Sequence, residues 1–253
     1  MSVSGPSLSD PLRYSVVVPF FNEEANVAPL LAEIRAVMAP LGTYEVVAVD
    51  DASNDGTRAR LLACATDPHL RVIGHGRNRG QSAALCSGID AARGEWIITL
   101  DGDGQNDPVD IARLLREVEG EPPPLLIGGH RQQRRDSGLR LLSSWVANGV
   151  RARLLGDATP DTGCGLKIIQ RAAFLKLPRF DHMHRFLPAL MRRDGAVIRS
   201  VAVSHRPRRH GVSKYGIWNR LWVGIVDLGG VMWLKRRAFR LAVVEELHHD
   251  PDH

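Results

Sequence analysis

Short runs of consecutive apolar residues alternate along the chain with longer segments in which apolar residues recur at helical spacing. The runs that predict buried strands are Tyr14–Phe21, Tyr44–Asp50, Leu70–Gly74, Glu95–Leu100, Leu125–Gly129 and Val197–Val203. The segments that predict helices are Val27–Leu41, Thr57–Ala65, Gln81–Ala92 and Pro108–Val118, and residues 131–160 also have a helical pattern. Gly94 is interpreted as the residue that closes the helix of residues 81–92. Continuous Val, Ile and Leu runs separated by helices indicate an α/β fold with a mostly parallel central sheet and helices on both faces.

Polar side chains follow these strands where the apolar runs end. They are Asn22-Glu23, Asp50-Asp51, His75 and Asp101 to Asp103. Ligands of open parallel sheets bind beyond the carboxyl ends of the strands, so these residues predict a binding site at that edge.

Composition narrows the class of protein. The 253 residues are enough for one large domain or for one domain plus an appendage. A composition of 44% hydrophobic and 24% charged residues is typical of a folded protein that can bury a core. A net charge of +5 favours a polyanionic partner. Three scattered cysteines without a CxxC pair indicate a reducing compartment. The polar N-terminus, with no apolar signal core, indicates a cytoplasmic protein, and no stretch of 18 apolar residues predicts a membrane-spanning helix.

The stretch LDGDGQNDP, residues 100–108, combines carboxylates and amides directly after a predicted strand. Oxygen ligands such as those of Asp101, Asp103 and Gln105 suit a hard cation, Mg²⁺ or Mn²⁺. An EF-hand loop is excluded, because Asn106 and Ala112 stand where that loop needs glycine and glutamate. The alternative is a turn whose aspartates cap the next helix.

Two common nucleotide signatures are missing. The first strand is not followed by GxGxxG, and GxxxxGK[ST] does not occur. A dinucleotide-dependent dehydrogenase and a P-loop NTPase are therefore both disfavoured. Carboxylates at strand ends can instead accept hydrogen bonds from a ribose hydroxyl or a base N–H.

Several motifs resemble one enzyme family. VVVPFFNEE, VDDASNDGT, HGRNRGQSAALCSGIDAARGE, LDGDGQNDP and DTGCGLK are similar, in order and spacing, to inverting glycosyltransferase family 2, which has the GT-A fold. HRFLPAL and HRPRRHGVSKYG resemble the dolichol-phosphate mannose synthase branch. Within it, the chain looks most like bacterial polyprenyl-phosphate sugar synthases, such as the dodecaprenyl-phosphate galacturonate synthase group. Longer members of the branch append two transmembrane helices.

The resemblance implies roles for the strand-end residues. The donor nucleotide would be held by Pro19, Asn22, Glu23, Asp50 and Asp51. Helix capping is the alternative for the two aspartates of the second strand. Asp101 would lie by the donor ribose and phosphates, and Asp101, Asp103 and Gln105 would hold the metal on the diphosphate. The metal would act as a Lewis acid for the leaving group.

An acceptor phosphate would need cationic side chains to bind it, but no general base to deprotonate it. A phosphate monoester has a second pKa of about 6 and is already a dianionic nucleophile at neutral pH. We therefore predict no dedicated base, with Asp161 only a weak candidate. The predicted acceptor-phosphate residues are Arg131, Arg140, Arg208, Ser213 and Lys214. The family implies the last three, with Arg208 also counted as catalytic, and the alternative for each arginine is a solvated basic face. His205 and His210 are interpreted as incidental.

The C-terminal part is basic and rich in tryptophan. Residues 205–240 contain nine Lys and Arg against one acid, Asp227, with Trp218, Trp222 and Trp233 interleaved. Such a segment favours the headgroup layer of a membrane, whereas a buried helix or an oligomer interface is the alternative. The predicted domains are a disordered N-terminus (1–12), a GT-A domain (13–210), a membrane-proximal helical segment (211–241) and a flexible tail (242–253).

Three functions fit these features to different degrees. The first is metal-dependent, inverting transfer of a sugar from a nucleotide donor to a polyprenyl phosphate, on the inner face of the plasma membrane, for cell-envelope glycan or lipid A modification. The second keeps the fold but transfers to a saccharide hydroxyl. The third, a basic nucleic-acid-binding protein, leaves the acidic motif unexplained, so we expect no nucleic-acid partner. The sequence is compatible with a homo-oligomer, and it does not identify the sugar that is transferred.

Overall fold

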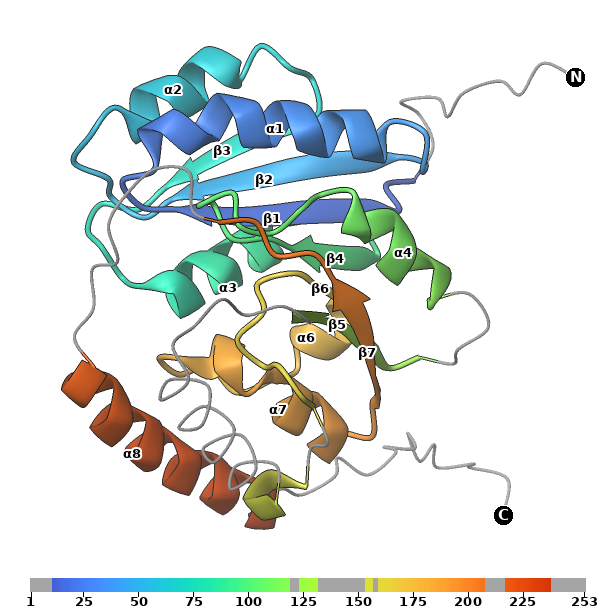
Figure 1. The fold of residues 1–253 in the computed structure, drawn as a ribbon, viewed down its shortest axis with the longest axis vertical. Coiled ribbons are helices and arrows are strands. Elements are labelled where there is room, and N and C mark those ends of the chain that lie inside the picture. The colour runs from blue at the N-terminus through green and yellow to red at the C-terminus, as the bar shows by residue number, and fades with distance from the viewer. Residues whose placement is uncertain (1–10, 119–122, 132–152, 157–158, 208–216, 238–253) are drawn as a thin grey trace, which may run out of the picture.

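The computed structural model describes residues 11–118, 123–131, 153–156, 159–207 and 217–237 (Figure 1). The strands are β1 Tyr14–Phe20, β2 Tyr44–Asp50, β3 Leu70–Gly74, β4 Trp96–Thr99, β5 Leu125–Arg131, β6 Lys167–Gln170 and β7 Val197–Val203. The helices are α1 Glu24–Met38, α2 Thr57–Cys64, α3 Gln81–Ala91, α4 Asp110–Arg116, α6 Arg171–Phe174, α7 Leu187–Arg193 and α8 Ile217–Arg236, with a 3₁₀ turn at Met183–Arg185.

The seven strands form one sheet in the order β3-β2-β1-β4-β6-β5-β7. All neighbouring pairs are parallel except those of β6, which runs antiparallel to both β4 and β5. The predicted, mostly parallel sheet is therefore confirmed. β6 was not predicted as a strand, because its four residues directly follow a glycine-containing turn and are too few to show a period.

The central strands β1, β2 and β4 are mostly apolar because both of their faces are buried, whereas the edge strand β7 has Arg199 and Ser200 exposed. In β1, Val16 and Val18 belong to one core and Val17 to the other, as the alternation of strand side chains requires. Figure 1 shows α1 and α2 on one side of the sheet and α3, α6 and α7 on the other. The prediction of helices on both faces is confirmed.

Most element boundaries agree with the predictions within a few residues, and three details differ. The predicted helix of residues 131–160 lies mostly outside the described residues. The helices α6 and α7 were not predicted. Gly94 was interpreted as the residue that closes α3, but its role is close packing, because a Cβ there would lie 2.6 Å from the carbonyl carbon of Tyr14.

The antiparallel direction of β6 shapes the functional edge of the sheet. Thr99 at the end of β4 pairs with Lys167 at the start of β6. The carboxyl ends of β5 and β7 lie at the same edge, because β5 runs antiparallel to β6 and parallel to β7. Residues from both ends of the domain therefore meet just beyond β4.

The last described helix, α8, contacts α7. Leu228 and Met232 pack against the core, and Val231 is buried within it. No helix within the described residues is long and apolar enough to cross a membrane.

Gly88 of α3 tests how closely this helix packs on the sheet. A Cβ at Gly88 would lie 2.4 Å from Cγ1 of Val17 and 3.0 Å from Cγ2 of Val49. We expect Gly88→Ala to destabilise the fold by about 1–3 kcal/mol through overpacking, despite the better helix propensity of alanine. Thermal unfolding should show this as a lower Tm. Gly76→Ala, which meets nothing within 4 Å, is the control. Equal Tm values for the two variants would contradict the packing.

Candidate functional site

The acidic loop, residues 101–107, directly follows β4 and folds back on itself. The backbone N–H of Asp101 donates to Oδ1 of Asn106 (3.2 Å), and the N–H of Gln105 donates to Oδ1 of Asp103 (3.1 Å). Gly104 has a φ of 70°, a conformation that glycine adopts without strain. These contacts gather Asp101, Asp103 and Gln105 into one compact turn at the carboxyl edge of the sheet.

Asp101 is fixed by two neighbours. Nε2 of Gln81, the first residue of α3, donates to its Oδ1 at 2.7 Å. A Cβ on Gly165 would lie 2.3 Å from the Asp101 carboxyl carbon, so only glycine fits there. Burial raises the pKa of Asp101 to about 6, and the Asp103 carboxylate adds to the rise, whereas Lys167 and Arg131 oppose it.

Lys167 places a buried cation near this carboxylate. Its ammonium group donates to the backbone oxygen of Cys164, and the residue is 4% exposed. Burial lowers the pKa of Lys167, while Cys164, Asp101 and Asp161 oppose the shift. The sequence predicts no role for Lys167, although this residue ends the motif DTGCGLK.

Arg131 forms a bidentate ion pair with Asp161. Its Nε lies 2.6 Å from Oδ2 and its Nη2 lies 2.9 Å from Oδ1. The pair brings together a predicted acceptor-phosphate residue and the weak candidate base. An incoming phosphate would compete with the Asp161 carboxylate for this guanidinium. The pairing also occupies both oxygens of Asp161, which makes it poorly placed to accept a proton.

The two aspartates at the end of β2 bind within the protein. Asp50 accepts from Nε of Arg58 (2.6 Å) and from the N–H of Ser53 (3.1 Å). Asp51 accepts from the N–H groups of Arg79 (2.9 Å) and Gly80 (2.8 Å), and its Oδ1 lies 2.6 Å from Nδ1 of His75. Asp51 thereby fixes the loop that leads into α3 and so positions Gln81.

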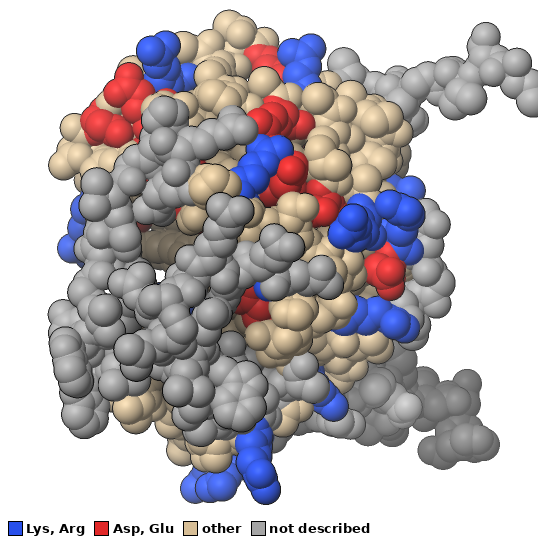
Figure 2. Space-filling model, viewed as in Figure 1, with Lys and Arg blue, Asp and Glu red and all other residues tan. Residues whose placement is uncertain are grey.

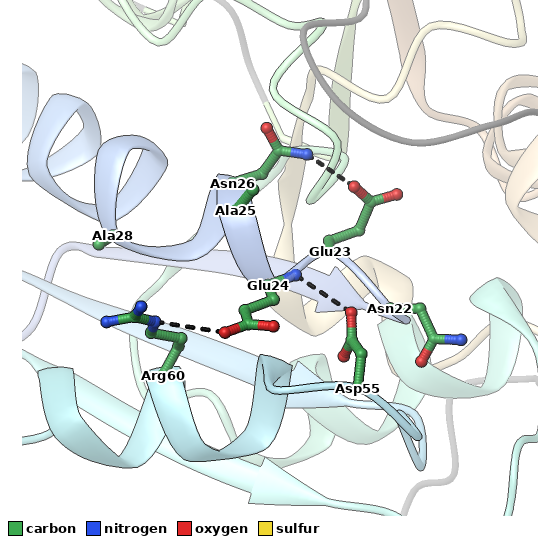
Figure 3. A pocket seen from close by; sticks show the side chains of 8 residues that line it. All are labelled: Asn22, Glu23, Glu24, Ala25, Asn26, Ala28, Asp55 and Arg60. Atoms are coloured by element: carbon green, nitrogen blue, oxygen red, sulfur yellow. Dashed lines mark hydrogen bonds and ion pairs between the residues drawn. The ribbon is translucent and has the colours of Figure 1, made fainter.

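Asn22 and Glu23 line a hollow of about 530 Å³ beside the start of α1 (Figure 3). Oδ1 of Asn22 accepts from the N–H of Asn54 (2.8 Å), and Glu23 points toward Asn26. The charged residues of the lining are Glu23, Glu24, Asp55 and Arg60. Three carboxylates against one guanidinium suit hydroxyl and N–H groups better than phosphates. Pro19, on the adjoining strand, lies under the acidic loop, where its carbonyl oxygen would be 2.6 Å from a Cβ on Gly102.

The segment after β7, residues 204–206, lies against the acidic loop. Nε2 of His205 lies 3.4 Å from Nε2 of Gln105, so this histidine lies beside the acidic loop, and its interpretation as incidental stays a prediction. The neighbouring Arg206 is paired with Asp107 and Glu33. Figure 2 shows acidic and basic side chains mixed on this face. The predicted residues Arg140, Arg208, Ser213 and Lys214, and also His210, lie outside the described residues.

The residues of the acidic loop fit a divalent cation. Within the described part of the chain, no group of three or more His, Cys, Asp or Glu side chains could hold a metal ion. Asp101, Asp103 and Gln105 form a different set, two carboxylates and an amide. Burial and the neighbouring Asp103 carboxylate both raise the pKa of Asp101, and a bound cation would favour the ionised form of this side chain.

Comparison with known proteins identifies a family and several relatives of this chain. The model of the family "Glycosyl transferase family 2" matches residues 15–177. The chain is 41% identical, over 236 residues, to a dodecaprenyl-phosphate galacturonate synthase of Rhizobium johnstonii, covering 90% of this chain and 69% of that protein. It is 36% identical, over 205 residues, to an undecaprenyl-phosphate 4-deoxy-4-formamido-L-arabinose transferase of Pseudomonas paraeruginosa, covering 79% of this chain but only 60% of the relative.

Solved structures share the fold. A mannosyltransferase of Pyrobaculum calidifontis in complex with GDP-Man and Mn²⁺ superposes with a TM-score of 0.65 at 20% identity, covering 95% of this chain and 68% of the other. Glucosyl-3-phosphoglycerate synthase of Mycobacterium tuberculosis, with Mn²⁺ and UDP-glucose, gives 0.64 at 18%, covering 88% and 80%. The predicted GT-A fold is confirmed at this level.

The raised pKa of Asp101 predicts a pH-dependent cost in the metal-free protein. The folded-state pKa of about 6 lies above the ordinary value of 3.8, so ionised Asp101 destabilises the fold above pH 6 and has no such effect below pH 4. Asp101→Asn should therefore raise stability by up to about 3 kcal/mol at pH 8, at 1.36 kcal/mol per pKa unit, and change little at pH 4.

Thermal unfolding in EDTA at both pH values measures this difference. Glu117→Gln, which removes an exposed carboxylate of the same domain, is the control and should leave Tm unchanged at either pH. A lower Tm for Asp101→Asn at pH 8 would contradict the electrostatic account.

Proposed function

Because this chain belongs to glycosyl transferase family 2, we propose that it transfers a glycosyl group, with inversion, from a nucleotide sugar to a polyprenyl phosphate. The reaction takes place at the inner face of the plasma membrane and supplies a lipid-linked sugar for cell-envelope glycan or lipid A modification. The observation that carries the proposal is the similarity to two relatives that are both named for a polyprenyl phosphate. The acidic loop at the carboxyl edge supports it independently.

The donor lies, on this proposal, across the carboxyl ends of β1, β2 and β4. Asn22, Glu23 and the aspartates of β2 border the nucleoside, where hydroxyl and N–H groups meet carboxylates. Asp101, Asp103 and Gln105 would hold Mg²⁺ or Mn²⁺. When bound, the cation supplies Lewis-acid stabilisation of the leaving diphosphate. Gln81 and Gly165 keep the Asp101 carboxylate in one orientation for this task.

The acceptor phosphate needs positioning and no proton transfer. Its second pKa of about 6 leaves it dianionic at neutral pH. We propose that the acceptor phosphate is bound by four cationic side chains and one hydroxyl, those of Arg131, Arg140, Arg208, Lys214 and Ser213. These residues would place the phosphate in line behind the anomeric carbon of the donor sugar. The pairing of Asp161 with Arg131 supports a mechanism without a dedicated base.

A transfer assay tests the proposed function. Purified protein is incubated with a panel of radiolabelled nucleotide sugars, undecaprenyl phosphate in detergent, and Mn²⁺ or Mg²⁺, with and without EDTA. We expect one donor to give a chloroform-soluble labelled product only when metal is present. Label in a soluble saccharide, and none in lipid, would replace the acceptor by a sugar hydroxyl. Metal-independent transfer would contradict the role of the acidic loop.

Asp103→Asn should abolish most of this transfer while the fold persists. Loss of one carboxylate from the cation site should lower kcat by at least about 100-fold, the scale on which a site loses one electrostatic contact in the transition state. Asp90→Asn removes a carboxylate from a surface ion pair with Arg179 and should keep wild-type rates. Wild-type turnover of Asp103→Asn would refute the assignment.

We further propose that α8 lies on the anionic membrane surface. Ile225, Val226 and Trp233 are 51%, 70% and 61% exposed, whereas Val231 on the opposite side is buried. Lys235, Arg236 and Arg237 follow at the carboxyl end of the helix. An exposed apolar stripe that ends in cations matches the headgroup layer, where each basic residue contributes about 1 kcal/mol.

Flotation with phosphatidylglycerol vesicles measures this binding. Val226→Ser together with Trp233→Ser should weaken binding roughly tenfold, because apolar area is lost from the inserted face. Leu62→Ser on α2 removes an apolar side chain that is 59% exposed and should leave binding unchanged. Equal flotation of the wild type and the Val226→Ser, Trp233→Ser variant would contradict a membrane role for α8.

A further inference from the structure

The segment Ser204–Arg206 is bound to the acidic loop and to the start of α4 along its backbone. The N–H of Ser204 donates to Oδ2 of Asp110 (2.7 Å), and the N–H of Arg206 donates to the carbonyl of Gln105 (2.9 Å). His205 and Asn106 form an antiparallel bridge between these two contacts. The segment therefore follows the acidic loop residue by residue.

The Arg206 side chain extends this attachment to α1. Its Nε lies 3.0 Å from Oδ2 of Asp107 and its Nη2 lies 2.7 Å from Oδ1, which makes a two-pronged contact with the end of the acidic loop. Its Nη1 lies 2.5 Å from Oε2 of Glu33 on α1. The side chain of Arg206 is only 24% exposed, so this cluster is partly shielded from water and salt.

Three separate elements meet at this cluster. A small pocket of about 60 Å³ is lined by residues of α1 (including Glu33), by Gly104 of the acidic loop and by Arg206. Figure 1 shows the chain after β7 running back across the sheet toward α1. The residues predicted to bind the acceptor phosphate, Arg208, Ser213 and Lys214, begin two positions after Arg206.

We propose that Arg206 is a positioning residue that holds Ser204–Arg206, the segment that follows β7, in register with the acidic loop. Three of its guanidinium N–H groups are committed to carboxylates, so it does not bind the acceptor phosphate itself. Through Asp107 and Glu33 it makes the donor side and the acceptor side of the site one rigid unit. This inference rests on the proposed function, because it concerns the alignment of the two phosphates.

Glu33 separates positioning from direct binding, because it lies on α1 and can affect the acceptor only through Arg206. With Glu33→Gln we expect the KM for undecaprenyl phosphate to rise about fivefold, while the Kd for Mn²⁺ and nucleoside diphosphate stays within twofold. Arg206→Lys, which loses the two-pronged contact with Asp107, should raise the KM for undecaprenyl phosphate more than Glu33→Gln does. The double variant should have nearly the same KM as Arg206→Lys alone. Hydrogen–deuterium exchange of residues 204–206 should become faster in both single variants.

Glu117→Gln is the control for all these measurements and should match the wild type. A Glu33→Gln protein with wild-type KM and wild-type exchange, beside an impaired Arg206→Lys, would overturn the inference in favour of direct phosphate binding. Faster exchange with an unchanged KM would overturn it as well, since Arg206 would then be structural only. Absence of any transfer by the wild type counts instead against the proposed function, and the exchange measurement still decides whether Glu33 and Arg206 hold the segment.

Discussion

The site depends on the burial of the Asp101 carboxylate at the end of β4, beside the second carboxylate of Asp103. Burial and the neighbouring Asp103 raise the pKa of Asp101 to about 6, and the nearby cations Lys167 and Arg131 offset this only in part. Such an arrangement is costly to the metal-free protein and becomes favourable when a divalent cation neutralises it. The close packing of Gly165 and the hydrogen bond from Gln81 prevent Asp101 from turning away.

The rest of the fold can be understood as the support for this loop. Parallel β1, β2 and β4 bring their carboxyl ends together, and antiparallel β6 returns Lys167 to the same edge. Asp51 ties the loop before α3, which carries Gln81, to the end of β2. The segment after β7 closes the arrangement from the other side through Arg206. The acidic loop and the segment after β7 that contacts it thus come from parts of the chain about a hundred residues apart, as the contacts Arg206–Asp107 and Gln105–His205 show.

The sequence predicted the parts of this architecture that rest on local patterns. Buried strands such as β2 and β4 were recognisable because most of their residues are apolar and all are buried, and the acidic loop stood out because its carboxylates directly follow such a strand. The partners of single side chains could not be predicted, because they depend on contacts between distant segments. Arg131 and Asp161 were assigned separate tasks, and His205 none, yet the fold pairs the first two and places the third on Gln105. Strand β6 was missed because four residues carry no periodic signal.

The most direct test of the account is to locate the cation in a crystal of the protein soaked with Mn²⁺ and a nucleoside diphosphate. The anomalous difference map should show one strong peak at about 2.2 Å from carboxylate and amide oxygens of the acidic loop, Asp103 and Gln105 among them, with the diphosphate on its other side. A nucleotide bound at the carboxyl edge without a peak at the acidic loop, or with the peak elsewhere, would contradict the central claim that these residues hold the metal.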